Sequence, residues 1–229
     1  MFNKGFKCLF VIVFLFGGLS LSSQTKADSL MRLIERSKEQ DKAQLYCYLA
    51  NQYLGKDYAK CYEYASQGLK LAIKYNIPFT KAFAMRQIGI YYDVNGDTKN
   101  AVLFIDSALS INRRIKDEGG ISACVSSLGI VHYNAGNYEK ALPLYIETLE
   151  FYEKKGNLSL QAYFAGNIGG IYRALEEHNK ATEYYKRAVD LAEKSTSKKA
   201  MGIAYNNLGA EYMHQENYVE AEKYLLKGL

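Results

Sequence analysis

The sequence predicts an all-α fold, an α-solenoid in which antiparallel helix pairs stack into a right-handed superhelix, and three observations favour it. Four glycines recur at a spacing of 40 residues: Gly89, Gly129, Gly169 and Gly209. An alanine follows each glycine after twelve residues: Ala101, Ala141, Ala181 and Ala221. The composition, with 48% hydrophobic and 23% charged residues and two prolines among 229, is typical of a folded, helix-rich chain. A fixed period of this length indicates a repeat array.

The first half of each repeat predicts one amphipathic helix. Positions −4, −1, 0 and +3 relative to the glycine lie on one stripe of a helix. In one repeat these positions hold Met85, Ile88, Gly89 and Tyr92. A glycine inside a helix costs about 1 kcal/mol relative to alanine, so its recurrence at one position indicates a close helix contact that offsets the loss. We expect this stripe to be the packed face.

The second half of each repeat predicts a second helix that runs antiparallel to the first. Turn residues such as Asn95-Gly96-Asp97 separate the two apolar stripes. The unit from Ser126 to Leu149 shows the pattern most clearly, and its second stripe begins at Ala141. Small residues at the glycine and alanine positions would let the two helices approach closely.

The repeat resembles the tetratricopeptide repeat. The resemblance is carried by the glycine, by an aromatic or histidine three residues later, by the alanine twelve residues later and by further positions sixteen and nineteen residues later. Those positions hold Tyr92, His132, Tyr172 and Tyr212, then Ile105, Tyr145, Tyr185 and Leu225, then Ala108 and Ala188. The family's repeat usually runs about 34 residues, with a proline near its end. This repeat runs 40 residues and lacks that proline, so it resembles a subclass with longer helices.

Residues 1–27 read as a secretory signal peptide. Lys4 and Lys7 precede an apolar run of fourteen residues, Cys8 to Leu21, which is followed by a short polar segment. This run is shorter than the roughly 20 residues that a helix needs to span a bilayer, so a permanent anchor is the weaker alternative. Cleavage is expected after Ala27 or before Gln24.

The remaining chain is predicted to form two parts. Residues 28–41 read as an N-terminal capping helix with Asp28 as its N-cap. Residues 42–229 read as an array of about five repeats. The last repeat stops at Leu229 after a short second helix, so we expect the sequence to be truncated and to continue in the full protein.

Charge and cysteine content exclude several functions. Without residues 1–27 the chain keeps 26 basic and 24 acidic residues, a net charge of +2, which is too small for an electrostatic nucleic-acid footprint. Cys47, Cys61 and Cys124 are odd in number and show no CxxC spacing, so neither a disulfide framework nor a zinc site is indicated.

No residue pattern predicts an enzyme. The S-x-x-K match at Ser195 to Lys198 falls in a turn between repeats and lacks its companion motifs. The glycines of Gly166 to Gly170 lie inside a helix rather than between a strand and a helix, unlike a phosphate-binding loop. His132, His178 and His214 share no spacing of metal ligands. We therefore assign no catalytic residue, no cofactor site and no metal site.

The remaining candidate site is a groove along the first helices. The resemblance implies that these helices line a concave surface, and positions −6, −3, +1 and +4 from the glycine form their second stripe. Candidate partner-binding residues are Phe83, Arg86, Ile90, Tyr133, Tyr163, Arg173 and Asn206. This mixture suits an extended or helical peptide. The alternative is a groove that has no dedicated ligand or is filled by a flanking segment.

These features predict an exported module that binds a protein or peptide in the groove and lies in the periplasm or at the cell surface. A signal peptide followed by long repeats resembles the exported sensor regions of bacterial histidine kinases and transcriptional regulators. The sharper prediction is thus the extracytoplasmic sensor portion of a signalling protein, with membrane contact only through a missing C-terminal segment. The alternative is a free-standing scaffold or adaptor.

Overall fold

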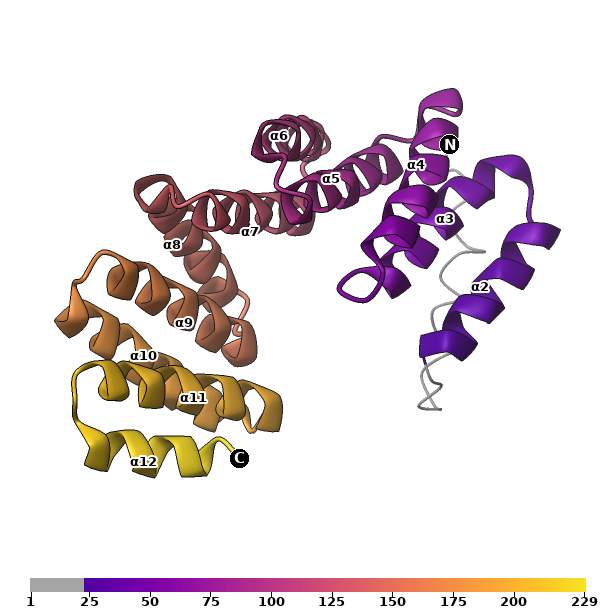
Figure 1. Cartoon of the computed structure of the whole chain (residues 1–229). Helices are drawn as coiled ribbons and strands as arrows, with labels where there is room; N and C mark the ends of the chain where they lie inside the picture. The colour runs from indigo at the N-terminus through magenta and orange to yellow at the C-terminus, as the bar shows by residue number, and fades with distance from the viewer. Residues whose placement is uncertain (1–22) are drawn as a thin grey trace.

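The computed structural model describes residues 23–229, and over that range the chain forms eleven α-helices and no strand (Figure 1). The helices are α2 (Ser23–Arg36), α3 (Glu39–Tyr53), α4 (Tyr58–Lys74), α5 (Pro78–Val94), α6 (Thr98–Ile115), α7 (Glu118–Asn134), α8 (Tyr138–Lys154), α9 (Leu158–Ala174), α10 (His178–Ser195), α11 (Lys198–His214) and α12 (Tyr218–Lys227). From α3 onward they form pairs that follow one another along an extended array, from α2 at one end to α12 at the other (Figure 1). The predicted all-α solenoid of stacked helix pairs is confirmed.

The turn inside each pair contains one residue in the left-handed region of the backbone. That residue is Gly96 with a φ of 78° and Gly136 with a φ of 73° in two pairs, and Glu176 and Glu216 at 60° and 58° in the next two. A left-handed residue ends a helix and redirects the chain, which is why glycine is favoured there. The spacing of 40 residues between these positions keeps every pair in the same geometry.

The repeated glycines mark the closest contacts between paired helices. A Cβ atom built on each of the four would lie 2.5 to 2.8 Å from a side-chain carbon of the residue sixteen positions later. Those later residues are Ile105, Tyr145, Tyr185 and Leu225. Real Cβ atoms do not approach so closely, so only glycine admits these side chains without a shift.

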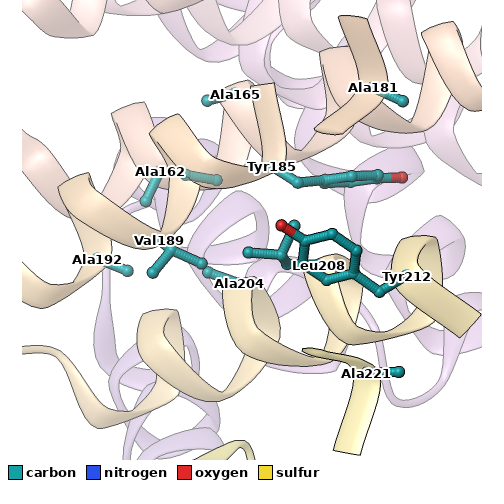
Figure 2. Packing of buried hydrophobic residues seen from close by; sticks show 11 residues of the cluster. Ala162, Ala165, Ala181, Tyr185, Val189, Ala192, Ala204, Leu208, Tyr212 and Ala221 are labelled. Carbon is teal, nitrogen blue, oxygen red and sulfur yellow. The ribbon is translucent and has the colours of Figure 1, made fainter. Parts of the chain in front are cut away.

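The core is a continuous seam between neighbouring pairs. Between α9, α10, α11 and α12 it consists mainly of alanines around a few large side chains, and Figure 2 shows Tyr185 lying beside Leu208 and Tyr212. Tyr185 is 2% exposed and Leu208 is fully buried. The alanines let the helices approach, and each large side chain then fills the space between two pairs.

The N-terminal helix differs from the predicted segment 28–41. Helix α2 begins at Ser23 and ends at Arg36, and Asp28 lies inside it rather than at its N-cap. Residues 39–41 belong to α3. The reason is packing, because Ala27 and Ile34 of α2 are buried in one cluster with side chains of α3. The predicted signal peptide, 1–27, lies outside the described residues over 1–22.

Candidate functional site

Two hollows lie side by side along the first helices of the last three pairs. One, which we call the polar hollow, has a volume of about 280 Å³ and lies between α7, α9 and α11. Its lining includes Tyr133, Tyr163, Gly166, Asn167, Gly170, Arg173, Tyr185 and Asn207. The other, the apolar hollow, measures about 300 Å³ and lies between α9 and α11. Its lining includes Leu160, Ala162, Tyr163, Ala200, Ile203, Ala204 and Asn207.

Glycines form the floor of the polar hollow. Gly166 and Gly170 are both buried and lie one turn apart on α9. A Cβ atom on Gly170 would lie 3.6 Å from the hydroxyl of Tyr133 and 3.7 Å from that of Tyr185. Both hydroxyls thus reach over a stretch of helix that carries no side chain.

Several polar groups around this hollow have no partner in the described chain. The side chains of Asn167 and Asn207 and the hydroxyls of Tyr133 and Tyr185 make no hydrogen bond to another described residue. Burial raises the pKa of Tyr185 to about 12, so its hydroxyl keeps its proton near neutral pH and can donate it. These groups are therefore free to bind a polar ligand.

Arg173 is the cation of the polar hollow. Its guanidinium carbon lies 6.0 Å from the ring centroid of Tyr185, and no carboxylate in the described chain forms an ion pair with it. The nearby carboxylates of Asp93 and Glu211 are occupied elsewhere. Asp93 accepts a hydrogen bond of 2.9 Å from Asn134, and burial raises its pKa.

The structure brings together three of the seven predicted groove residues. Tyr133, Tyr163 and Arg173 line the polar hollow. Asn206 lines neither hollow and instead lies beside Gly228 at the end of α12, while its neighbour Asn207 lines both. A shift of one position turns a helical side chain by about 100°, which the sequence pattern alone did not resolve.

The other three predicted residues lie on α5, outside both hollows. The guanidinium carbon of Arg86 lies 5.7 Å from the ring centroid of Phe83, and Arg86 donates a long hydrogen bond of 3.4 Å to Ser127 on α7. Burial lowers the pKa of Arg86. Ile90 is partly buried on the same helix. These residues form a separate stretch of the surface.

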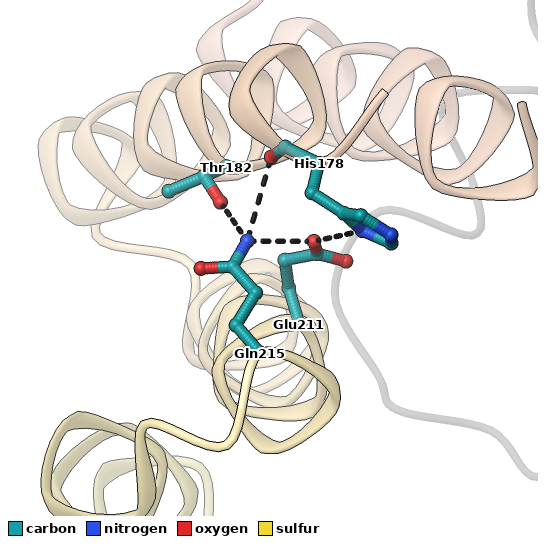
Figure 3. Close-up of polar contacts among 4 residues, drawn as sticks. All are labelled: His178, Thr182, Glu211 and Gln215. Atoms are coloured by element: carbon teal, nitrogen blue, oxygen red, sulfur yellow. Dashed lines mark hydrogen bonds and ion pairs between the residues drawn. The ribbon is translucent and has the colours of Figure 1, made fainter. Parts of the chain in front are cut away.

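A polar cluster between α10 and α11 was not predicted (Figure 3). Glu211 is fully buried, and its Oε1 accepts a hydrogen bond of 2.9 Å from Gln215 and lies 3.1 Å from Nδ1 of His178. Gln215 also donates to the hydroxyl of Thr182 at 2.8 Å. A glutamate on a buried helical stripe, four residues before a glutamine, was the only signal in the sequence.

The described residues offer little else for chemistry. Cys47, Cys61 and Cys124 are free and buried, and burial raises the pKa of Cys47 to about 12 and that of Cys61 to about 11. Within 23–229 no three His, Cys, Asp or Glu side chains are placed to hold a metal ion. None of the helices in this range combines the length and apolar character that crossing a membrane requires.

Comparisons with known proteins agree with this geometry. Models of the tetratricopeptide repeat match residues 121–194 and 203–229, so such repeats are present in this chain. No curated protein matches the sequence significantly. The repeats, the fold and the paired hollows define a protein-interaction module of the tetratricopeptide type.

Solved structures with low sequence identity share the fold. BtubC (BKLC) from P. vanneervenii has 17% identity and a TM-score of 0.71, with 90% of this chain and 86% of that one covered. A signal transduction ATPase with a tetratricopeptide repeat sensor, from Pyrococcus horikoshii, has 21% identity and a TM-score of 0.73 over 94% of this chain, which spans 33% of that protein. A Rap protein complexed with Competence and Sporulation Factor has 16% identity and a TM-score of 0.69, with coverages of 90% and 69%. At these identities the likeness shows the fold alone.

Proposed function

We propose that this chain is an exported interaction module that binds a peptide or a peptide segment of a protein across the two hollows. The observation that carries the proposal is the set of polar groups around the polar hollow, which have no partner in the described chain, beside an exposed apolar wall. Tyr163 belongs to both hollows and is 41% exposed. A surface with free hydrogen-bonding groups and exposed aromatic area suits an extended chain.

Peptide selection tests this function. A phage-displayed random peptide library is panned on the immobilised protein, and enriched peptides are synthesised and measured by fluorescence anisotropy. We expect Tyr163→Ala to weaken their binding and Tyr218→Ala to leave it unchanged, because Tyr218 is also exposed, at 61%, but lies on α12 outside both hollows. Enrichment of no peptide, or equal binding by the Tyr163→Ala protein, would refute the proposal.

The sharper form of the proposal is the sensor portion of a bacterial signalling protein, located in the periplasm or at the cell surface. It is supported by the layout of residues 1–27 and by the tetratricopeptide repeat sensor in the Pyrococcus horikoshii protein. A free-standing scaffold remains the alternative. The two differ in whether occupation of the groove changes the activity of an attached signalling domain in the native host.

Export has its own test. Fusing alkaline phosphatase, which is active only outside the cytoplasm, to the C-terminus should give an active reporter in cells. Mass spectrometry of the exported protein should show a new N-terminus between Ser23 and Asp28. Recovery of an inactive fusion, or of a chain with residues 1–20 intact, would contradict the cleaved signal peptide.

A further inference from the structure

The two hollows form one continuous binding surface with unlike ends. They share Tyr163 and Asn207, so a ligand can pass from one to the other without crossing a ridge of a third helix. One end is formed by Arg173, free amides and tyrosine hydroxyls. The other end is formed by aliphatic side chains, of which Ile203 is 40% exposed. A ligand that fills both must itself be polar at one end and apolar at the other.

The polar end is built for an anion. A guanidinium with no carboxylate partner pairs strongly with a ligand carboxylate, because it donates hydrogen bonds in a planar fork. The tyrosine ring beside Arg173 is uncharged near neutral pH, since burial raises the pKa of Tyr185 to about 12. The half-buried setting of Arg173 reduces screening by water, so an acidic group gains more here than it would on an open surface.

The apolar end accepts one large side chain. Its volume of about 300 Å³ lies at the lower end of the range for ligand pockets. Ala162 and Ala204 are almost completely buried at its base, while Ile203 and Tyr163 are left partly exposed. A leucine, methionine or phenylalanine side chain would cover these two exposed groups.

The helix geometry sets the spacing between the two ends. Arg173 follows Tyr163 by ten residues on α9, which corresponds to about 15 Å along the helix axis. An extended chain rises about 3.3 Å per residue, so it spans that length in about four to five residues. The amides of Asn167 and Asn207 lie between the ends, where they can bind the backbone of such a chain.

We propose that the groove recognises a peptide segment that carries an acidic side chain for Arg173 and, about four to five residues away, a large apolar side chain for the hollow at Ile203. This inference rests on the proposed function, since it names the ligand of the same site. The acidic residue supplies the specificity and the apolar residue supplies buried area.

The enriched peptides from the selection above test the pattern. We expect them to share an acidic and an apolar position at that spacing. Replacing the acidic residue by its amide should weaken binding to the natural protein about tenfold, and Arg173→Gln should do the same. The amide peptide should then bind the Arg173→Gln protein no more weakly than the acidic peptide does, because the two changes remove the same interaction.

Matched variants separate the two ends. Ile203→Ser should weaken peptides with the apolar residue and leave the effect of the acidic residue intact. Arg187→Gln is the control, since Arg187 lies on α10 in an ion pair with Glu153 and lines neither hollow. It should not change binding.

Failure of the inference is distinct from failure of the function. Peptides that are enriched and lost on Tyr163→Ala, but lack the acidic position or ignore Arg173→Gln, would overturn the inference and leave the peptide groove in place. Peptides that ignore Tyr163→Ala, or no enrichment at all, would overturn both. Independent, additive effects of Arg173→Gln and of the amide peptide would also overturn the pairing.

Discussion

Gly169 and Gly170 are neighbours on α9 with opposite surroundings. A Cβ atom on Gly169 would lie 2.8 Å from Cδ1 of Tyr185, whose ring is buried and cannot move aside. A Cβ atom on Gly170 would meet only the hydroxyls of Tyr133 and Tyr185, at ordinary contact distances of 3.6 and 3.7 Å. One glycine is needed for packing, and the other leaves the floor of the polar hollow open.

Alanine at these two positions should therefore have opposite effects. Gly169→Ala should lower the free energy of unfolding by about 1 to 3 kcal/mol, because it overpacks the contact with Tyr185. Gly170→Ala should raise the free energy of unfolding by up to about 1 kcal/mol, because alanine favours the helix. Urea denaturation of both variants measures the difference. Shifts in the same direction would show that the contact with Tyr185 is not as tight as described.

Ser122 carries a buried hydroxyl without a hydrogen-bond partner. It is 4% exposed on α7, where the equivalent positions of two other repeats hold Ala82 and Ala162. It lines a hollow of about 440 Å³ between α7 and α8, although its oxygen itself is closed off from solvent. A buried polar group left unpaired costs about 1 to 3 kcal/mol.

Ser122→Ala should accordingly raise the free energy of unfolding by about 1 kcal/mol. Ser127→Ala is the matched control on the same helix, because the Ser127 hydroxyl donates to the carbonyl of Ala123 at 2.8 Å and accepts from Arg86. That change should destabilise the protein. Thermal melts of the two variants would contradict this account if Ser122→Ala were the less stable one.

His132 occupies a position that holds tyrosine in the other repeats, and it should make stability depend on pH. Burial is the main cause that lowers its pKa, Lys140 adds to the effect and Asp106 opposes it. Its contribution to stability is complete above the unfolded pKa of about 6.5 and is lost as pH falls through the lowered folded pKa. His132→Tyr should therefore lose less stability than the natural protein between about pH 7.5 and 5.5. Equal losses in urea denaturation at the two pH values would rule out His132 as the cause.

At the scale of the element, the Glu211 cluster joins α10 to α11. Gln215 donates from one nitrogen to Glu211, to Thr182 and, at 3.5 Å, to the carbonyl of His178 (Figure 3). The other oxygen of Glu211 is buried without a partner, so the carboxylate depends on the few donors that it has.

Gln215→Ala should destabilise the contact between these helices by about 1 to 3 kcal/mol, because it removes a donor from a buried carboxylate without opening a cavity. Amide hydrogen exchange should rise most in α11. Gln67→Ala is the control, since exposed Gln67 on α4 makes one exposed hydrogen bond to Glu63 and should change stability by less than about 0.5 kcal/mol. An equal effect of the two changes would mean that the cluster stabilises nothing.

The elements that the sequence predicted are those coded by local periodicity. The glycine and alanine positions place the paired helices from α5 onward because one stripe of each helix must face its neighbour. The start of α2 was missed because it depends on the burial of Ala27 against α3, a contact between segments. Asn207 and Glu211 were missed for a related reason, since the face that a polar side chain occupies depends on the exact stacking of repeats. Arg173 and Tyr163 were found because they flank glycines on one stripe.

At the scale of the whole molecule, stability is distributed along the array. Each pair contacts mainly the pairs before and after it, and the buried clusters follow that order. In such an array a local change is felt by its neighbours and fades with distance. Ala141 on α8 is fully buried, in one cluster with Tyr145 of the same helix and with Phe164 and Ile168 of α9.

Ala141→Leu tests both the packing and its reach. Leucine inserts three additional carbons at a close contact and should lower the free energy of unfolding by about 1 to 3 kcal/mol. Because Ala141 lies between two pairs, hydrogen exchange should rise in α7, α8 and α9 and stay unchanged in α3 and α4, which lie two pairs away. Unchanged stability would mean that Ala141 is not at a close contact. A uniform rise over all helices would mean that the array unfolds as one unit rather than pair by pair.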